Sequence, residues 1–346
     1  MTRRPRAIRP ATLTPELIAV WSALLDKAVL LRDLEPWTII NGTSLLGVLD
    51  RRSGDIDWCS VMGQGGQLFG VAVYPGDRGL ASHQRILRDK IDRIDAHIAQ
   101  VAVVLSYNDK DMVGEDMRAV LKACGRRYRG RNSWPEMLIH EPGFLQTPPM
   151  ELATVERITR VIDALIVMTE LAYADPGWDT HDAQDRPWVA ESAEEGGWVP
   201  RRRAMPTPSD PPLPRIAFDE VAAVRAATKR SQSTVLMDWF SAQAVVDGPE
   251  AAGRPYYAIH VVALDLSLGK IIGVETCRLE EAWTELARLL VAVSTDKGVP
   301  KKTVVRRAQA KAILAPAAAA LGTTLVHDPN TEDVIVEILE GLSSML

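Results

Sequence analysis

The chain has 346 residues, of which 47% are hydrophobic and 25% are charged. This composition excludes an intrinsically disordered chain and provides enough apolar side chains for two domains of ordinary size. The net charge of −5 excludes a protein whose overall field draws it onto nucleic acid or anionic lipid, so binding to either would need a local basic patch.

Cysteine usage and the amino terminus indicate the compartment. The three cysteines are far apart and form no C-x-x-C pair, which argues against a disulfide framework and fits a reducing cytosol. Residues 1–17 are basic but lack the apolar run of a signal peptide. The uncharged stretch 58–76 is broken by Gly and Gln, unlike a membrane span. We therefore expect a cytoplasmic protein without a membrane partner.

The first 175 residues predict an antiparallel meander flanked by helices. Thr14 and Pro15 begin a helix over residues 14–34, whose apolar side chains recur at helical spacing. Strands are expected at 45–50, 55–62 and 68–74, and the turn-like links between them predict an antiparallel meander. The further elements expected are a helix at 79–99, a strand at 101–107, a helix at 115–124, a surface-wrapping loop at 126–149 and a long helix at 151–173.

Residues 176–214 are rich in Pro, Gly and charge and follow neither a helical nor a strand period. They predict an irregular linker between one domain at 1–175 and another at 215–346, with the Pro-rich residues 200–214 as the boundary. Three tryptophans, Trp178, Trp188 and Trp198, lie in this segment, and we expect them to dock it onto its own domains.

The elements expected after residue 215 follow a distinctive order. A helix at 218–229 precedes strands at 233–246, 256–265 and 270–277, and then come a helix at 279–294, a strand at 303–306, a helix at 309–321, a strand at 323–326 and a helix at 332–342. This order, with Asp238 in the first strand, resembles the ribonuclease H-like fold of integrases and transposases. The expected class is therefore α/β and α+β: a helix-flanked meander domain followed by a ribonuclease H-like domain of three layers.

The whole chain also resembles an uncharacterised two-domain bacterial family of unknown function. The residues that carry the resemblance are Pro36-Trp37, then "LLGVLDRRSG" and "EPGFLQTPPMELATVE", and in the second half "VVALDLSLGKIIG". This resemblance implies the architecture and no particular activity.

The ribonuclease H-like resemblance implies a metal site that this sequence does not complete. In that fold, carboxylates from the first strand, the end of the fourth strand and the last helix bind two Mg²⁺ or Mn²⁺ ions. Asp238 fits the first place, but Arg306 or Arg307 occupies the second, and a guanidinium repels a cation. The last helix offers Glu332, Asp333 and Glu337. We therefore expect a degenerate site without a metal or other cofactor.

Other motifs favour structural roles. The glycines in residues 63–67 suggest a phosphate-binding loop, but such a loop leads into a helix and here a strand follows, so we expect a turn. Asp265 precedes a hairpin turn and is expected to support it. The six histidines lack zinc-binding spacing. Cys59 has no base that the sequence can assign to it as a nucleophile.

One segment combines positive charge with aromatic rings. Its side chains could track a single nucleic-acid strand through phosphate contacts and base stacking, or lie in a solvated loop that pairs with nearby acids. These residues are Arg126, Arg127, Tyr128, Arg129, Arg131 and Trp134.

The sequence favours a non-catalytic binding or adaptor protein with an unidentified protein partner. One alternative is a divergent metal-dependent nuclease that uses Asp238 with Glu332 or Glu337 and Mg²⁺ or Mn²⁺. A second alternative is a non-catalytic nucleic-acid binder that uses the Arg-rich residues 126–131.

Overall fold

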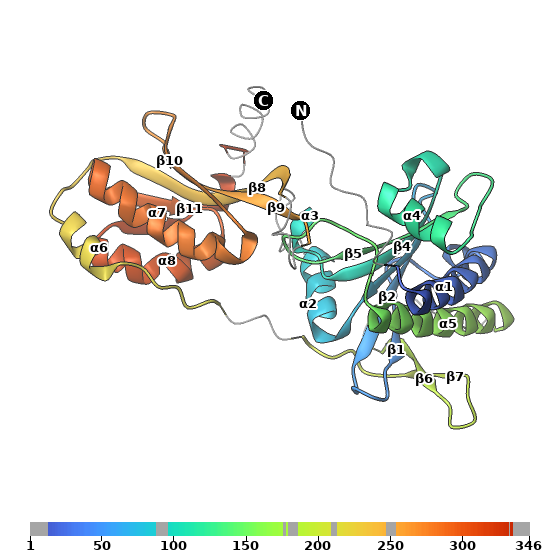
Figure 1. Ribbon diagram of the computed structural model, residues 1–346. Coiled ribbons are helices and arrows are strands. Elements are labelled where there is room, and N and C mark those ends of the chain that lie inside the picture. Colours follow the sequence, from blue (N-terminus) through green and yellow to red (C-terminus); the bar gives the residue numbers. More distant parts are fainter. Residues whose placement is uncertain are drawn as a thin grey trace. The chain divides into compact units, whose positions relative to one another are not determined.

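The computed structural model describes residues 13–87, 96–175, 178, 186–208, 213–246, 254–331 and 333–334. The chain forms two compact units, the first mainly from residues before 211 and the second mainly from residues 211–346 (Figure 1). Each unit contains a mixed β-sheet with helices packed on it, as the predicted α/β class requires. None of the described helices combines the length and apolar character needed to cross a membrane.

The first unit is built on a seven-stranded sheet in the order β5-β4-β3-β2-β1-β6-β7. The predicted meander is confirmed, because β1 pairs with β2 and β2 with β3 in antiparallel register, and two further antiparallel strands continue it. These strands are β1 (Leu45–Leu49), β2 (Ile56–Met62), β3 (Phe69–Tyr74), β4 (Ala102–Asn108) and β5 (Trp134–His140).

Helices cover both faces of this sheet. Helices α1 (Pro15–Asp33) and α5 (Leu152–Ala174) lie side by side, and together with α4 (Glu115–Ala123) they bury one apolar face (Figure 1). Helix α2 (Gly76–Leu87) packs Leu80 against Trp58 and Tyr74 on the other face. Because both faces are covered, β2 and β3 are buried along almost their whole length and do not alternate between buried and exposed residues.

The start of α1 follows the sequence signals. Thr14 is the N-cap, and its hydroxyl accepts a hydrogen bond from the amide of Leu17 at 3.3 Å. Trp21 is fully buried one turn later, and its indole Nε1 donates to the carbonyl of Pro149 at 3.1 Å. The buried indole therefore has its hydrogen bond, and α1 is fixed to the segment that leads into α5.

The prediction that residues 176–214 are irregular is wrong for part of that range. Strands β6 (Trp188–Ser192) and β7 (Trp198–Arg202) form a hairpin, and β6 joins the sheet parallel to β1. The turn contains Gly196 and Gly197, both at positive φ, between two Trp-Val pairs. This hairpin pattern was obscured by the surrounding Pro and acidic residues.

The tryptophans of this segment dock it onto the first unit, as expected. Trp178 and Trp188 stack with their ring centroids 4.6 Å apart, and both pack against the core of the sheet. The indole of Trp198 donates to Asp163 of α5 at 3.0 Å. The hairpin is therefore part of the folded unit.

Two smaller differences concern the segments around β4 and β5. Within the predicted helix 79–99, the described residues form α2 and the short helix α3 (Ala96–Ala99), and residues 88–95 lie outside the described range. The predicted surface loop 126–149 contains β5, because residues 134–140 pair along the full length of β4.

The second unit has a five-stranded sheet in the order β10-β9-β8-β11-β12. Its first three strands are antiparallel neighbours, and β11 and β12 run parallel to β8. Helices α6, α7 and α8 pack on one face (Figure 1). The elements are α6 (Glu220–Ala226), β8 (Thr234–Val246), β9 (Tyr256–Asp265), β10 (Lys270–Cys277), α7 (Ala282–Lys297), β11 (Lys302–Val305), α8 (Ala308–Leu321) and β12 (Thr324–His327).

The predicted order of elements is confirmed as far as β12. Asp265 supports the β9–β10 turn as expected, because its Oδ1 accepts hydrogen bonds from the amides of Ser267 at 2.9 Å and Leu268 at 3.2 Å. Of the predicted last helix, only residues 333 and 334 lie within the described range, where they are helical.

The glycine-containing link between β2 and β3 is a turn, as predicted. A substitution of Gly63 in this turn can test the packing of the first unit. A Cβ at Gly63, where φ is 144°, would lie 2.7 Å from the side chain of Trp37. We expect Gly63→Ala to lower the free energy of unfolding by about 1–3 kcal/mol, measured by chemical denaturation of the full chain. Gly65→Ala is the control, since a Cβ there has nothing within 4 Å. Equal stability of the two variants would contradict this packing.

Candidate functional site

The register of two parallel strands brings Asp238 and Arg306 together. Alternation along β8 places Asp238 on the same face as Leu236 and Phe240, opposite the face that carries α7 and α8. Strand β11 pairs with β8 so that Val305 lies opposite Met237. The next residues along the two strands, Arg306 and Asp238, are therefore neighbours on adjacent strands.

The carboxylate of Asp238 is bound by two arginines in the interior. Arg306 Nε donates to Asp238 Oδ2 at 2.6 Å, and Arg307 Nη1 forms an ion pair with Oδ1. The amide of Trp239 also donates to Oδ1 at 2.8 Å. The side chains of Asp238 and Arg306 are only 2% and 1% exposed, so this is a buried charge cluster.

Neighbouring groups contact the side chain of Arg307 and the backbone of Arg306. The guanidinium of Arg307 lies over the Trp239 ring at 3.7 Å from its centroid, a cation–π contact. His327, the last residue of β12, makes a 2.9 Å hydrogen bond through Nε2 with the backbone carbonyl of Arg306. Residues of β8 and β12 thus hold the cluster from both sides of β11.

This donor set does not suit a divalent cation. Both oxygens of Asp238 already interact with guanidinium groups, which are permanently charged and cannot act as ligands. Asp333 is described and exposed, whereas Glu332 and Glu337 lie outside the described residues. Among the described residues, no three Cys, His, Asp or Glu side chains come together in a way that could hold a metal ion.

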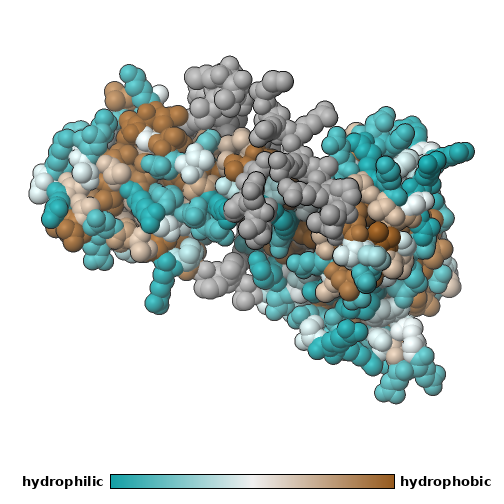
Figure 2. Space-filling model, viewed as in Figure 1, coloured by the Kyte–Doolittle hydropathy of each residue, from teal (hydrophilic) through white to brown (hydrophobic). Residues whose placement is uncertain are grey.

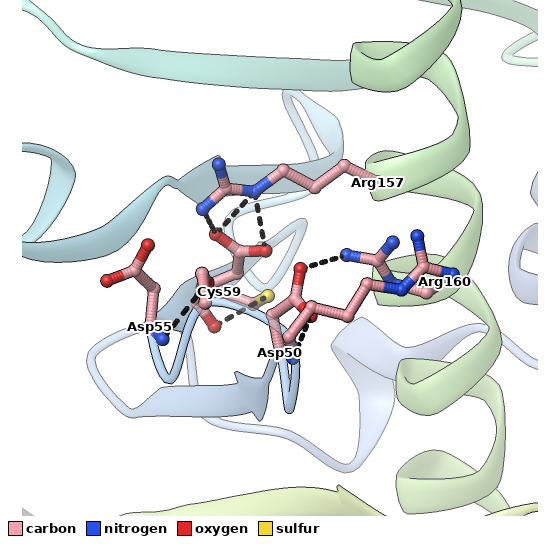
Figure 3. A network of polar contacts seen from close by, with 8 residues as sticks. Asp50, Asp55, Cys59, Arg157 and Arg160 are labelled. Carbon is pink, nitrogen blue, oxygen red and sulfur yellow. Dashed lines mark hydrogen bonds and ion pairs between the residues drawn. The ribbon is translucent and has the colours of Figure 1, made fainter.

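A second charge cluster, absent from the sequence predictions, fastens α5 to the β1–β2 hairpin. Figure 3 shows Arg157 and Arg160 extending from the helix towards the aspartates of the hairpin. Arg157 donates to both oxygens of Asp57, through Nε at 2.9 and 3.0 Å and through Nη2 at 2.5 Å. Arg160 Nη2 donates to Asp50 at 2.6 Å. Asp57 is buried, and its bidentate pairing identifies it as a structural residue.

Cys59 lies beside this cluster and does not suit nucleophilic chemistry. Its side chain is fully buried, and its Sγ contacts the carbonyl of Asp57 at 3.9 Å. Burial raises the pKa of the thiol well above its ordinary value, and the charge of Asp57 raises the pKa further. A nucleophilic cysteine needs the opposite shift.

The basic segment divides into one paired arginine and three exposed ones. Arg126 forms an ion pair with Asp26 at 2.7 Å and also donates to the carbonyl of Ser22. Arg127, Arg129 and Arg131 are exposed. The sequence could not make this distinction, because Asp26 lies 100 positions earlier, in α1.

Comparison with known families divides the chain into two matched regions. Residues 21–188 match a model described as a domain of unknown function (DUF7309), and residues 220–343 match another domain of unknown function (DUF6930). Together the two models cover most of the chain, in agreement with the two-domain family that the sequence resembles. No curated protein matches the chain.

The Asp57–Arg157 pair gives a stability prediction for the first unit. Arg157→Ala leaves a carboxylate buried without its bidentate partner, so we expect the free energy of unfolding to fall by about 3–5 kcal/mol. Arg160→Ala removes a more exposed pair and should cost about 1 kcal/mol or less. Chemical denaturation followed by tryptophan fluorescence measures both. Similar losses for the two variants would contradict the distinction.

Proposed function

We propose that the protein is a non-catalytic binding protein whose second unit is a ribonuclease H-like domain with a degenerate metal site. The order of its elements supports this fold: an antiparallel three-strand meander leads through α7 into a parallel strand, and then through α8 into another. Asp238 lies in the first strand of this order, where the resemblance implies a metal ligand.

The observation that carries the proposal is the contact of both Arg306 and Arg307 with Asp238 in the protein interior. Two-metal chemistry needs several carboxylates that converge on ions about 3.5–4 Å apart. Two unit charges about 4 Å apart repel by about 4 kcal/mol at an effective dielectric constant of 20, and a divalent ion doubles that figure for each arginine. The guanidinium groups therefore oppose a cation and take over its role of neutralising the carboxylate.

In the nuclease alternative, Asp238 and either Glu332 or Glu337 would bind a metal ion. It requires Arg306 to leave a 2.6 Å bond in the interior before Asp238 could bind an ion. Moving either arginine away would break a buried charge pair, which typically costs several kcal/mol. This cost favours a binding protein over a nuclease.

The two functions predict opposite effects of removing the Asp238 charge. In an empty metal site, a carboxylate without a partner destabilises the fold, so neutralising its charge does not lower the free energy of unfolding. In the arginine cluster, Asp238→Asn leaves two guanidiniums without their carboxylate, and we expect the free energy of unfolding to fall by about 3–5 kcal/mol. Chemical denaturation of the full chain in EDTA measures the effect.

Asp265→Asn is the matched control for this change. Asp265 is also a buried carboxylate in the second unit, but among the described residues it accepts hydrogen bonds only from backbone amides, which an amide oxygen also accepts. We expect it to cost about 1 kcal/mol or less. An Asp238→Asn variant as stable as the wild type would overturn the proposal.

A further inference from the structure

The basic segment of the first unit forms a loop with a rigid backbone. This basic loop, residues 125–134, begins where α4 ends: Gly125 has a φ of 66°, and the amide of Arg126 donates to the carbonyl of Leu121 at 2.9 Å. That pattern is a Schellman motif, which closes the helix and sets the direction of the chain.

The far end of the basic loop is fastened as well. The amide of Asn132 donates to Asp109 Oδ1 at 2.9 Å, and Arg32 Nη1 donates to the carbonyl of Ser133 at 3.2 Å. The backbone of the loop is therefore held in place at both ends before any ligand arrives, which reduces the backbone entropy lost on binding. Figure 2 shows hydrophilic residues gathered over the part of the first unit where Figure 1 places α4.

One side of the basic loop borders a groove of about 590 Å³. Among the described residues that line it there is no carboxylate. Positive charge and aromatic rings dominate the lining, which consists of Lys110, Arg127, Tyr128, Arg129, Gly130 and Trp134. The groove is thus a local site of positive charge in a protein whose net charge is negative.

The two rings of the groove are anchored and partly accessible. Tyr128 and Trp134 lie edge to face with their centroids 5.8 Å apart, and both pack against the core of the first unit. Each ring is only half-buried, so part of its surface lines the groove. Rigid rings beside arginines are the combination with which proteins bind unpaired bases and their phosphates.

Two arginines of the segment differ from those that face the groove. Arg126 is held by Asp26 and does not line the groove. Arg131 borders a separate hollow that also contains Asp33 and Glu35, so an anion there meets negative charge. Within the described part of the chain, Arg127 and Arg129 form no ion pair with a carboxylate, and they remain available to a ligand.

We propose that this groove binds single-stranded nucleic acid, with Lys110, Arg127 and Arg129 contacting phosphates and Tyr128 or Trp134 stacking on a base. This inference rests on the proposed function as a binding protein and names its ligand class. A duplex would offer phosphates, but its bases are already stacked and out of reach of the rings. An acidic peptide would use the arginines and gain little from the rings.

The test measures binding of a fluorescein-labelled oligothymidylate to the full chain by fluorescence anisotropy, in EDTA and over a series of salt concentrations. Arg127→Ala with Arg129→Ala removes the positive charges that would meet two phosphates. We expect the affinity to fall about tenfold or more. The slope of log K against log salt should become shallower by about 1.4, because each phosphate that the protein no longer neutralises changes it by about 0.7.

The charge-matched control is Arg51→Ala with Arg52→Ala, which removes two exposed arginines from the β1–β2 turn of the same unit. It should bind as the wild type does. Tyr128→Leu keeps all charges, and we expect it to lower the affinity about fivefold or more with the salt slope unchanged. This pairing of effects separates base stacking from charge.

The inference would be overturned by no binding of the oligothymidylate, by an equal loss from the Arg51 and Arg52 control, or by an equally tight complex with duplex DNA. A different outcome is that polyglutamate competes as strongly as oligothymidylate while Tyr128→Leu leaves the affinity unchanged. That pair of results would also overturn the inference and would point to an acidic protein as ligand. Cleavage of the oligothymidylate in Mn²⁺ would contradict the non-catalytic function but not the groove, because binding is measured in EDTA.

Discussion

The buried contact between Asp238 and the guanidinium groups of Arg306 and Arg307 is the constraint on which the account of the second unit depends. Three ionised groups, two positive and one negative, are tolerated in the interior because the carboxylate pairs with both guanidiniums and because hydrogen bonds hold them in place. The parallel register of β8 and β11 makes the contact possible, since it places the end of one strand beside the middle of the other. A sheet that brought two carboxylates to this position would need a cation, and this one supplies its positive charge from the chain.

The arginines of this protein stand in two different settings. Arg157 and Arg306 are bonded to buried carboxylates and hold elements of the fold together. Arg127 and Arg129 lie on a loop whose backbone is already fixed at both ends, and they face solvent. A permanently charged, planar side chain suits both roles: in the interior it makes directional pairs, and at the surface it is the group that the proposed phosphate contacts require. The surroundings of each arginine, rather than its identity, decide which role it has.

Much of the fold could be predicted because its signals are local. Short stretches of sequence indicate the cap at Thr14 and the turns between β1, β2 and β3. They also indicate each of the elements after residue 215 and therefore their order. The β6–β7 hairpin was missed because its strands are short and its neighbours are rich in proline and acid. The place of an arginine, Arg306 or Arg307, beside Asp238 was predicted from the resemblance, whereas the pairing of Asp57 with Arg157 was not. Those two residues are 100 positions apart, and no local pattern connects a strand aspartate to one arginine among several on a helix.

We propose that guanidinium groups stand where a ribonuclease H-like enzyme would hold its metal ions. Anomalous diffraction from crystals of the full chain soaked in Mn²⁺ tests it most directly, because the signal locates manganese without reference to activity. The account predicts no manganese within ligand distance of the Asp238 carboxylate and density for Arg306 in contact with it. Manganese coordinated by Asp238, with Arg306 turned away, would contradict it.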